Sequence, residues 1–228
     1  MPTGVRGEWY QNLSLHFPLS NVIIVGHSAG ALVAASATLQ SAKSVVGAVF
    51  VSPPFFFKKP APVTKPWSKL KSRYMMAKSM TDRGESLKKV HLSTNVERIL
   101  TDSFVEKFAA PTRFPRFADA CVEGMMVKEA PYEDLLDELL SIPSNDEGRS
   151  PVPLLFVYGR EDNIKPLPEE KQKELLQLKI DAIDKTTRDQ QQVLETIIVE
   201  KSHHYVQHEQ PEELAKEIVT FVQKNILL

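Results

Sequence analysis

The 228-residue sequence contains a single cysteine, Cys121, which excludes an internal disulfide framework and is compatible with a reducing compartment. No apolar run approaches the roughly 18 residues that span a bilayer, and residues 1–12 lack the apolar core of a signal peptide. The formal net charge of −1 gives no reason to expect nucleic acid or an anionic membrane as a partner. These absences lead us to expect a cytoplasmic protein with neither a membrane span nor a nucleic-acid partner.

The apolar residues that are present form four short segments without polar alternation, a pattern typical of parallel strands buried on both faces. The segments rich in Val, Ile, Leu and Phe are residues 22–25, 45–51, 153–158 and 195–199. Helical patterns separate or follow them, most clearly at residues 31–37, 169–192 and 211–227. Alternation of strands and helices predicts an α/β fold with a mostly parallel sheet covered by helices.

Residues 59–148 differ from the rest, because they contain helix-length segments and no convincing strand. The expected helices are residues 65–80, 95–108, 114–127 and 132–141, and the segments that begin at Thr101 and Ala130 resemble helix starts. We therefore expect a core of residues 1–58 and 149–228, interrupted by a helical insertion at 59–148.

The first apolar segment leads directly into Gly26-His27-Ser28-Ala29-Gly30 and then into a helix of small residues. A strand, G-x-S-x-G and a helix in this order indicate a nucleophile elbow, although a plain strand–turn–helix connection with a capping serine is the alternative. An elbow predicts a strained backbone at Ser28, with Gly26 and Gly30 supplying room where a Cβ would clash. The helix dipole and the N–H of Ala29 would both favour a developing oxyanion.

Two further segments carry ionisable residues just after a predicted strand. Asp162 lies three residues after Gly159, and His203 and His204 follow the last strand. A turn aspartate and an exposed polar loop are the alternatives for these residues. The order Ser28, Asp162, His204 is that of a Ser-Asp-His triad, and the carboxyl ends of parallel strands meet at one edge of the sheet. Serine needs an imidazole as base, which in turn needs a carboxylate to orient it.

VIIVGHSAGA, LLFVYGREDNIKP and SHHYVQHEQPEEL together resemble the elbow, acid loop and histidine segment of the α/β-hydrolase fold superfamily of esterases and lipases. The resemblance covers residues 21–58 and 150–228. It implies a serine hydrolase for a small, apolar acyl or ester substrate, without cofactor or metal, and with residues 59–148 as a helical cap. The family's spacing to Glu209 and Pro211 selects His204 over His203 and His208 as the base. Ser28 is then the nucleophile and Asp162 the residue that orients His204.

Phe55 and Phe56 follow the second strand, where the insertion would join the sheet. They are candidates to line an apolar substrate pocket, although core packing is the favoured role for this position.

The sequence departs from the family by having only 21 residues before the elbow strand, and no His-Gly dipeptide to supply a second oxyanion N–H. We therefore expect the N-terminal part of the sheet to be absent, and the strand at 22–25 to present an exposed edge open to self-association. A truncated hydrolase and a non-catalytic binding or interaction protein both remain open. Carbon–carbon cleavage, peroxidation and acyl transfer are alternatives to ester hydrolysis.

Overall fold

The computed structural model describes residues 20–40, 44–55, 88, 91, 93–110, 114, 132–140, 151–164, 169–170 and 193–226. The chain divides into two compact units, one made of Met1–Lys58 with Ala130–Leu228 and the other of Lys59–Glu129. Helix α8 (Tyr132–Leu140), which the sequence pattern assigned to the insertion, groups instead with the first unit.

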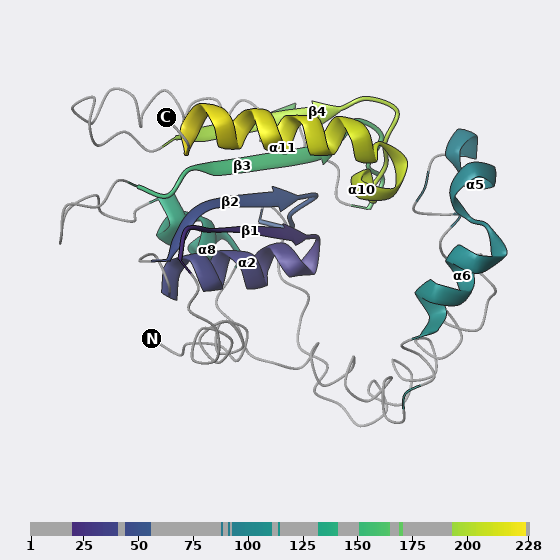
Figure 1. Ribbon diagram of the computed structural model, residues 1–228, viewed down its shortest axis with the longest axis horizontal. Helices are drawn as coiled ribbons and strands as arrows, with labels where there is room; N and C mark the ends of the chain where they lie inside the picture. Colours follow the sequence, from purple (N-terminus) through teal and green to yellow (C-terminus); the bar gives the residue numbers. More distant parts are fainter. Residues whose placement is uncertain are drawn as a thin grey trace. The chain divides into compact units, whose positions relative to one another are not determined.

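In the described part of the first unit, four parallel strands form a sheet in the order β1-β2-β3-β4 (Figure 1). They are β1 (Val22–His27), β2 (Val45–Val51), β3 (Leu154–Gly159) and β4 (Leu194–Val199). All four predicted strands are confirmed, and so is the parallel α/β fold. Because the strands run in one direction, their carboxyl ends lie along the same edge of the sheet.

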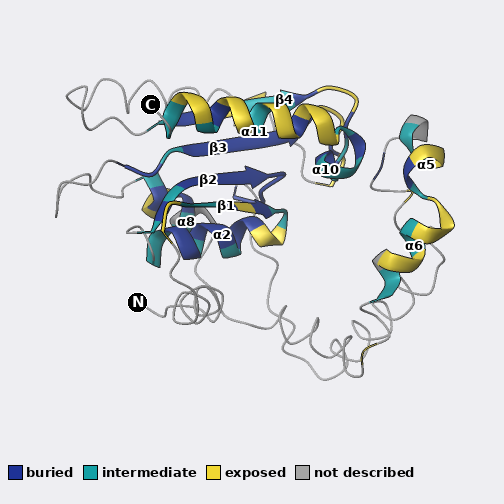
Figure 2. Ribbon diagram, in the orientation of Figure 1, coloured by how far each residue is buried: buried dark blue, intermediate teal, exposed yellow. Residues whose placement is uncertain are grey.

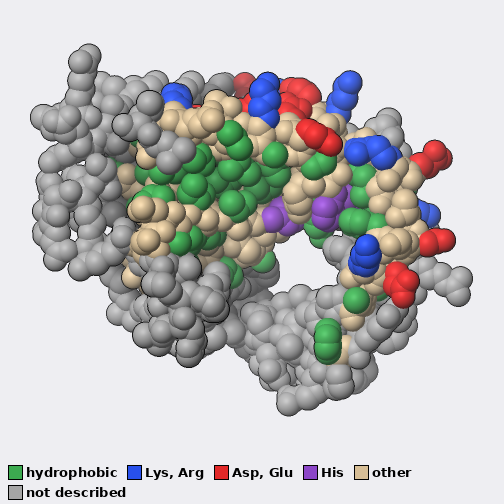
Figure 3. Space-filling model, in the orientation of Figure 1, with side chains coloured by type: hydrophobic (Ala, Val, Ile, Leu, Met, Phe, Trp, Pro, Cys, Tyr) green, Lys and Arg blue, Asp and Glu red, His purple; other side chains and the backbone are tan. Residues whose placement is uncertain are grey.

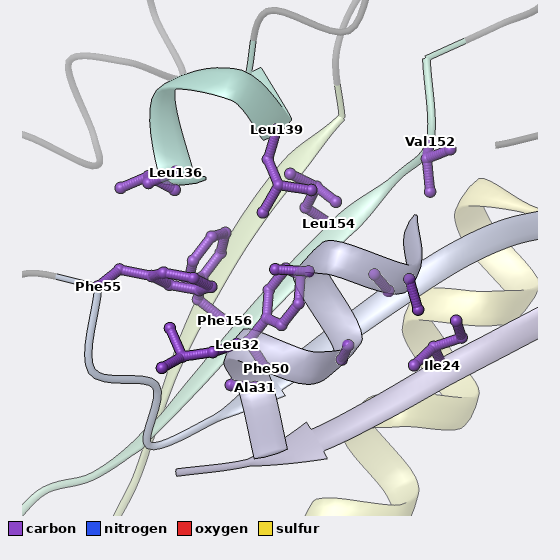
Figure 4. Close-up of a cluster of buried hydrophobic side chains, with 14 of the residues drawn as sticks. Ile24, Ala31, Leu32, Phe50, Phe55, Leu136, Leu139, Val152, Leu154 and Phe156 are labelled. Atoms are coloured by element: carbon purple, nitrogen blue, oxygen red, sulfur yellow. The ribbon is translucent and has the colours of Figure 1, made fainter. Parts of the chain in front are cut away.

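Side chains of the strands alternate between two hydrophobic clusters, one on each face of the sheet. Ala48 and Phe50 of β2 belong to the first cluster, whereas Val49 and Val51 belong to the second. Helices α2 (Ala29–Gln40) and α8 cover the first cluster, and helix α11 (Pro211–Asn225) covers the second. Burial on both faces explains why the sequences of β2 and β3 are continuously apolar, whereas β4 carries Glu195 and Thr196 and is only partly buried. Figure 4 shows the first cluster, with Phe50, Phe55 and Phe156 between the sheet and α8.

Helices α2 and α11 differ in how they approach the sheet. Helix α2 presents small residues, and a Cβ added at Gly26 would come within 2.8 Å of the Cβ of Ala34, so no larger residue fits at Gly26. Helix α11 is amphipathic: it buries Leu214 and Phe221 and exposes its outer side (Figure 2). The sequence PEEL that begins α11 places a proline in its first turn, where a missing N–H is tolerated.

The second unit contains α5 (Ser93–Ile99) and α6 (Asp102–Ala109), where one helix was predicted over 95–108. The helix is interrupted because Thr101 is extended, with φ −66° and ψ 157°, and its hydroxyl accepts a hydrogen bond from the N–H of Phe104 at 3.3 Å. The predicted helix start at Thr101 is therefore confirmed. The helix predicted at 65–80, and nearly all of those at 114–127 and 169–192, lie outside the described residues.

None of the helices in the described part of the chain is both long enough and apolar enough to cross a membrane.

Candidate active site

Ser28 lies in the tight turn between β1 and α2, with a left-handed backbone of φ 52°. Its N–H donates to the carbonyl of Val51 at 2.8 Å, which fixes the turn against the end of β2. The predicted strain at Ser28 and the predicted close approach at Gly26 are both present. The prediction for Gly30 is wrong: this residue is exposed in the first turn of α2, and an added Cβ would contact nothing within 4 Å.

Asp162 lies in the loop that follows β3, and its side chain is buried. The N–H of Asp162 donates to the carbonyl of Gly159 at 3.2 Å, and its Oδ1 accepts the N–H of Ile164 at 2.8 Å. One carboxylate oxygen thus stabilises the loop, as the turn interpretation requires. The other, Oδ2, lies 2.9 Å from Nδ1 of His204.

His204 follows β4 and is buried between the other two side chains, 42 residues from Asp162 and 176 from Ser28 in sequence. A carboxylate can only accept, so Nδ1 of His204 carries the hydrogen and donates to Asp162. In the neutral ring Nε2 then accepts the hydroxyl of Ser28, whose Oγ lies 2.9 Å away. The structure therefore brings together Ser28, His204 and Asp162, and places His204 rather than His203 between the other two.

Ala29 directly follows Ser28 in the sequence and is the first residue of α2. As the first helical residue it has no carbonyl one turn earlier inside the helix to which it could donate. Ala29 is exposed, and the first turn of α2 carries no acidic side chain. The N-terminus of α2 therefore offers a donor and a partial positive charge beside Ser28.

A comparison with known protein families shows to which family this chain is related. The model of the alpha/beta hydrolase family matches residues 6–217 of the chain. The chain belongs to the α/β hydrolase family. Among curated proteins, no relative matched.

Several solved structures of this fold resemble this chain at low sequence identity. A thermophilic esterase from Thermogutta terrifontis superposes with a TM-score of 0.61 and 16% identity, over 94% of this chain and 70% of the esterase. The 2-hydroxy-6-oxo-6-phenylhexa-2,4-dienoate hydrolase from Rhodococcus sp. gives 0.62 and 18%, over 97% and 70%. A bromoperoxidase from Bacillus anthracis gives 0.60 and 14%, over 94% and 71%. At these identities the likeness concerns the fold alone.

Residues around the loop of His204 form contacts that sequence patterns did not predict. The N–H of Glu161 donates to the carbonyl of Ser202 at 3.0 Å, and the N–H of Ser202 donates to Oε2 of Glu161 at 3.1 Å. A Cβ added at Gly159 would overlap the carbonyl oxygens of Ser202 and His203. The loops after β3 and β4 are therefore in direct contact, and only glycine fits at 159.

Glu209, the last residue of the short helix α10 (Val206–Glu209), is buried beneath the same loop. Its Oε2 accepts the N–H of His203 at 2.5 Å and the hydroxyl of Ser202 at 3.4 Å. In the sequence Glu209 served only as a spacing marker for His204. Its neighbours Gln207, His208 and Gln210 are polar and only partly buried, so the local sequence pattern gave no signal of its burial.

His27 contacts His204 from the other side. Its Nε2–H donates to the carbonyl of His204 at 2.8 Å, and the two rings lie 4.9 Å apart. Burial, together with neighbouring His204 and His208, lowers the pKa of His27 to about 4, so its ring is neutral at neutral pH. Figure 3 shows histidine side chains gathered at the end of the sheet to which the strands point.

Tyr158 is buried near the carboxylate of Asp162. Burial and the negative charge of Asp162 both raise the pKa of Tyr158, so the hydroxyl keeps its proton. Within the described residues, neither the Tyr158 hydroxyl nor that of buried Ser52 has a hydrogen-bond partner. Tyr158 therefore adds no negative charge beside the carboxylate of Asp162.

The aromatic candidates are placed only in part. Phe55 is fully buried, with its ring 5.3 Å from Phe50 and 5.9 Å from Phe156, which is the core-packing role that the sequence favoured. Phe56 lies outside the described residues. Among the residues that are described, no group of three or more His, Cys, Asp or Glu side chains is arranged to hold a metal ion.

Proposed function

We propose that this α/β hydrolase is a serine hydrolase that cleaves an ester or a similarly activated acyl compound through an acyl-enzyme. Ser28 is the nucleophile, His204 the general base and Asp162 the residue that orients His204. The observation that carries the proposal is the chain of two 2.9 Å hydrogen bonds that joins these three side chains. Contacts of this kind between residues so distant in sequence match the requirement of serine for a base, and of that base for a carboxylate.

In the first half of the reaction, Oγ of Ser28 attacks the acyl carbonyl carbon while its proton passes to Nε2 of His204. The imidazolium that forms is stabilised by Asp162, which holds Nδ1–H throughout. As the tetrahedral intermediate collapses, the bond from carbon to the leaving oxygen breaks. Nε2–H of His204 then protonates that oxygen and the alcohol leaves.

In the second half, water attacks the acyl carbon of the ester on Ser28. Nε2 of His204 takes a proton from the water, and returns it to Oγ of Ser28 when the carboxylic acid is released. Cleavage of a carbon–carbon bond and acyl transfer would use the same nucleophile and base, with a different leaving group or acceptor. The proposal therefore specifies the roles of the three residues more closely than the identity of the substrate.

The N–H of Ala29 and the dipole of α2 are proposed to stabilise the oxyanion. A preorganised donor at this position stabilises charge that develops only in the transition state, and loss of one such donor typically costs about 100- to 1,000-fold in kcat. The first turn of α2 has no acidic residue that would oppose this charge. We assign the selection of the acyl group to the helical insertion, taken as residues 59–129 because α8 packs on the sheet.

A fluorophosphonate probe tests the nucleophile directly, because it reacts only with a serine activated by a base. We expect the wild-type protein to be labelled at Ser28, as located by peptide mass spectrometry, and S28A to remain unlabelled. S52A is a matched control, since Ser52 is a buried serine with a left-handed backbone at the end of the neighbouring strand. No labelling of the wild type, or labelling at another serine, contradicts the proposal and favours a non-catalytic binding protein.

A further inference from the structure

Glu209 is a buried carboxylate outside the three residues of the proposed triad. Only 1% of its surface is exposed, and a buried carboxylate is costly unless hydrogen-bond donors compensate for its lost hydration. Two donors to this carboxylate are the main-chain N–H of His203 and the hydroxyl of Ser202, and both reach the same oxygen, Oε2. The Ser202 hydroxyl also lies 3.3 Å from the carbonyl of His203, so the N–H of His203 is the stronger donor. The carboxylate therefore binds the two residues that directly precede His204.

Two hydrogen bonds, one to Glu209 and one from His27, hold the main chain around His204. Glu209 binds the N–H of His203, one peptide before His204, while His27 donates to the carbonyl of His204 itself. The N–H of His203 belongs to the Ser202–His203 peptide and the carbonyl of His204 to the peptide that follows His204, so the two hydrogen bonds fix both ends of the His203–His204 segment. This limits the backbone rotation of that segment and so the position of the His204 side chain. Glu209 is five residues after His204, so this contact forms within one short stretch of chain.

The imidazole of His204 can act as a base for Ser28 only in a narrow range of positions. Nε2 and Nδ1 must stay within hydrogen-bond distance of Ser28 and Asp162 at the same time, and each is 2.9 Å from its partner. Misplacing a catalytic group by about 1 Å can cost about 100-fold in rate. A small shift of the Ser202–His203 main chain is enough to produce such a displacement.

We propose that Glu209 is a positioning residue for His204, which acts by holding the main chain at Ser202 and His203 and does not touch reacting atoms. This inference rests on the proposed function for its effect on turnover, but not for its effect on the placement of the ring. The property that matters is the position of the acceptor oxygen, not the charge of the carboxylate.

Two conservative substitutions separate position from charge. E209Q keeps the length of the side chain and an acceptor oxygen but removes the charge, so we expect kcat to fall by no more than about tenfold, as for a weakened hydrogen bond. E209D keeps the charge but withdraws the oxygen by one methylene, so we expect kcat to fall by about 100-fold. KM should change little in either variant. E213Q and E213D are the matched controls, because Glu213 is exposed in the first turn of α11.

The kcat values are expressed per active site titrated with the fluorophosphonate, so that loss of folded protein does not count as loss of rate. A merely structural role would lower the melting temperature and leave kcat per site unchanged, which would overturn the proposal. A larger loss in E209Q than in E209D would also overturn it, because charge would then be the important property.

Proton NMR supplies a readout that does not depend on turnover. The Nδ1–H of His204 bound to Asp162 should give a far-downfield resonance in the wild type that is absent from H204A. We expect this resonance to persist in E209Q and to shift or broaden in E209D, with faster hydrogen exchange at the His203 amide. An unchanged resonance and unchanged exchange in E209D would refute the positioning role. If the wild type is not labelled by the probe, the proposed function fails while this measurement still decides the role of Glu209.

Discussion

The two sides of the site are built in different ways. On the histidine side, all six residues of β3 are buried, and the loops after β3 and β4 bind each other through Glu161 and Ser202. On the nucleophile side, β1 is only partly buried, with Val25 53% exposed, and among the described residues it pairs with β2 alone. The histidine and the acid thus depend mainly on contacts between distant segments, whereas Ser28 depends on a local turn and one hydrogen bond to the end of β2.

This difference predicts where the site is sensitive to mutation. Positions that transmit contacts between the loops after β3 and β4 should affect both activity and stability. Exposed positions in β1, before the elbow, should affect mainly association, because they contribute less to the buried core. The following experiments test this contrast, from the largest expected effect to the smallest.

The largest effect is expected at the two adjacent histidines. H204A removes the proposed base and should lower kcat by about a thousandfold or more, as loss of a triad member does. H203A should cost little, because the contact of His203 with Glu209 is made by its main-chain N–H. Steady-state kinetics on an activated ester measures both. Comparable losses, or a larger loss in H203A, would show that the wrong ring was chosen.

The next effect is expected from a single methyl group at Gly159. G159A forces a Cβ against the carbonyls of Ser202 and His203, so we expect a loss of about 1–3 kcal/mol in the free energy of unfolding and a lower kcat. G30A is the control, because the added Cβ enters open space in a helix and should stabilise by about 0.5–1 kcal/mol. Chemical denaturation measures both changes. Equal stability of the two variants would mean that the loops after β3 and β4 are not tightly coupled.

Sequence patterns predicted the strands and the proximity of three polar side chains because the signals for both are local. Runs such as those of β2 and β3 identify buried strands by themselves, and the position of Ser28, Asp162 and His204 just after strand ends brings them to one edge. The role of Glu209 could not be predicted, because its partners include a main-chain N–H, which every residue except proline carries. The error at Gly30 has a similar cause, since G-x-S-x-G does not say which glycine lies against a neighbour.

A moderate effect of pH is expected from His27. Its pKa is lowered from 6.5 to about 4 in the folded state, so the unfolded chain binds more protons in this range. The stability that His27 contributes is therefore fully present above pH 6.5 and is lost as the pH falls through about 4.

H27Q tests this linkage, since glutamine presents a donor similar to Nε2–H but does not titrate. The melting temperature of the wild type should fall more steeply than that of H27Q between pH 6.5 and 4, as followed by circular dichroism. Parallel curves for the two proteins would mean that the pKa of His27 is not lowered by folding.

The smallest effect on the fold is expected at the edge of the sheet, where we predict self-association through β1. V25K should reduce association, because a lysine on an edge strand opposes pairing with another strand, and should leave the melting temperature nearly unchanged. V219K is a matched control, since Val219 on α11 is 52% exposed against 53% for Val25. Size-exclusion chromatography with light scattering compares them. An equal change in both variants, or a monomeric wild type, would argue against association through β1.

The contact between the loops after β3 and β4 has a consequence for how the protein can change in evolution. Residues 165–192 separate the acid from β4 in sequence, but the chain on either side of this segment is joined by the pairing of β3 with β4 and by the hydrogen bonds between Glu161 and Ser202. Doubling the length of a closed loop costs only about 0.6 kcal/mol. Insertions and deletions can therefore accumulate between Asp162 and His204 while the two side chains stay in register, which makes this segment a place where family members can diversify without losing their chemistry.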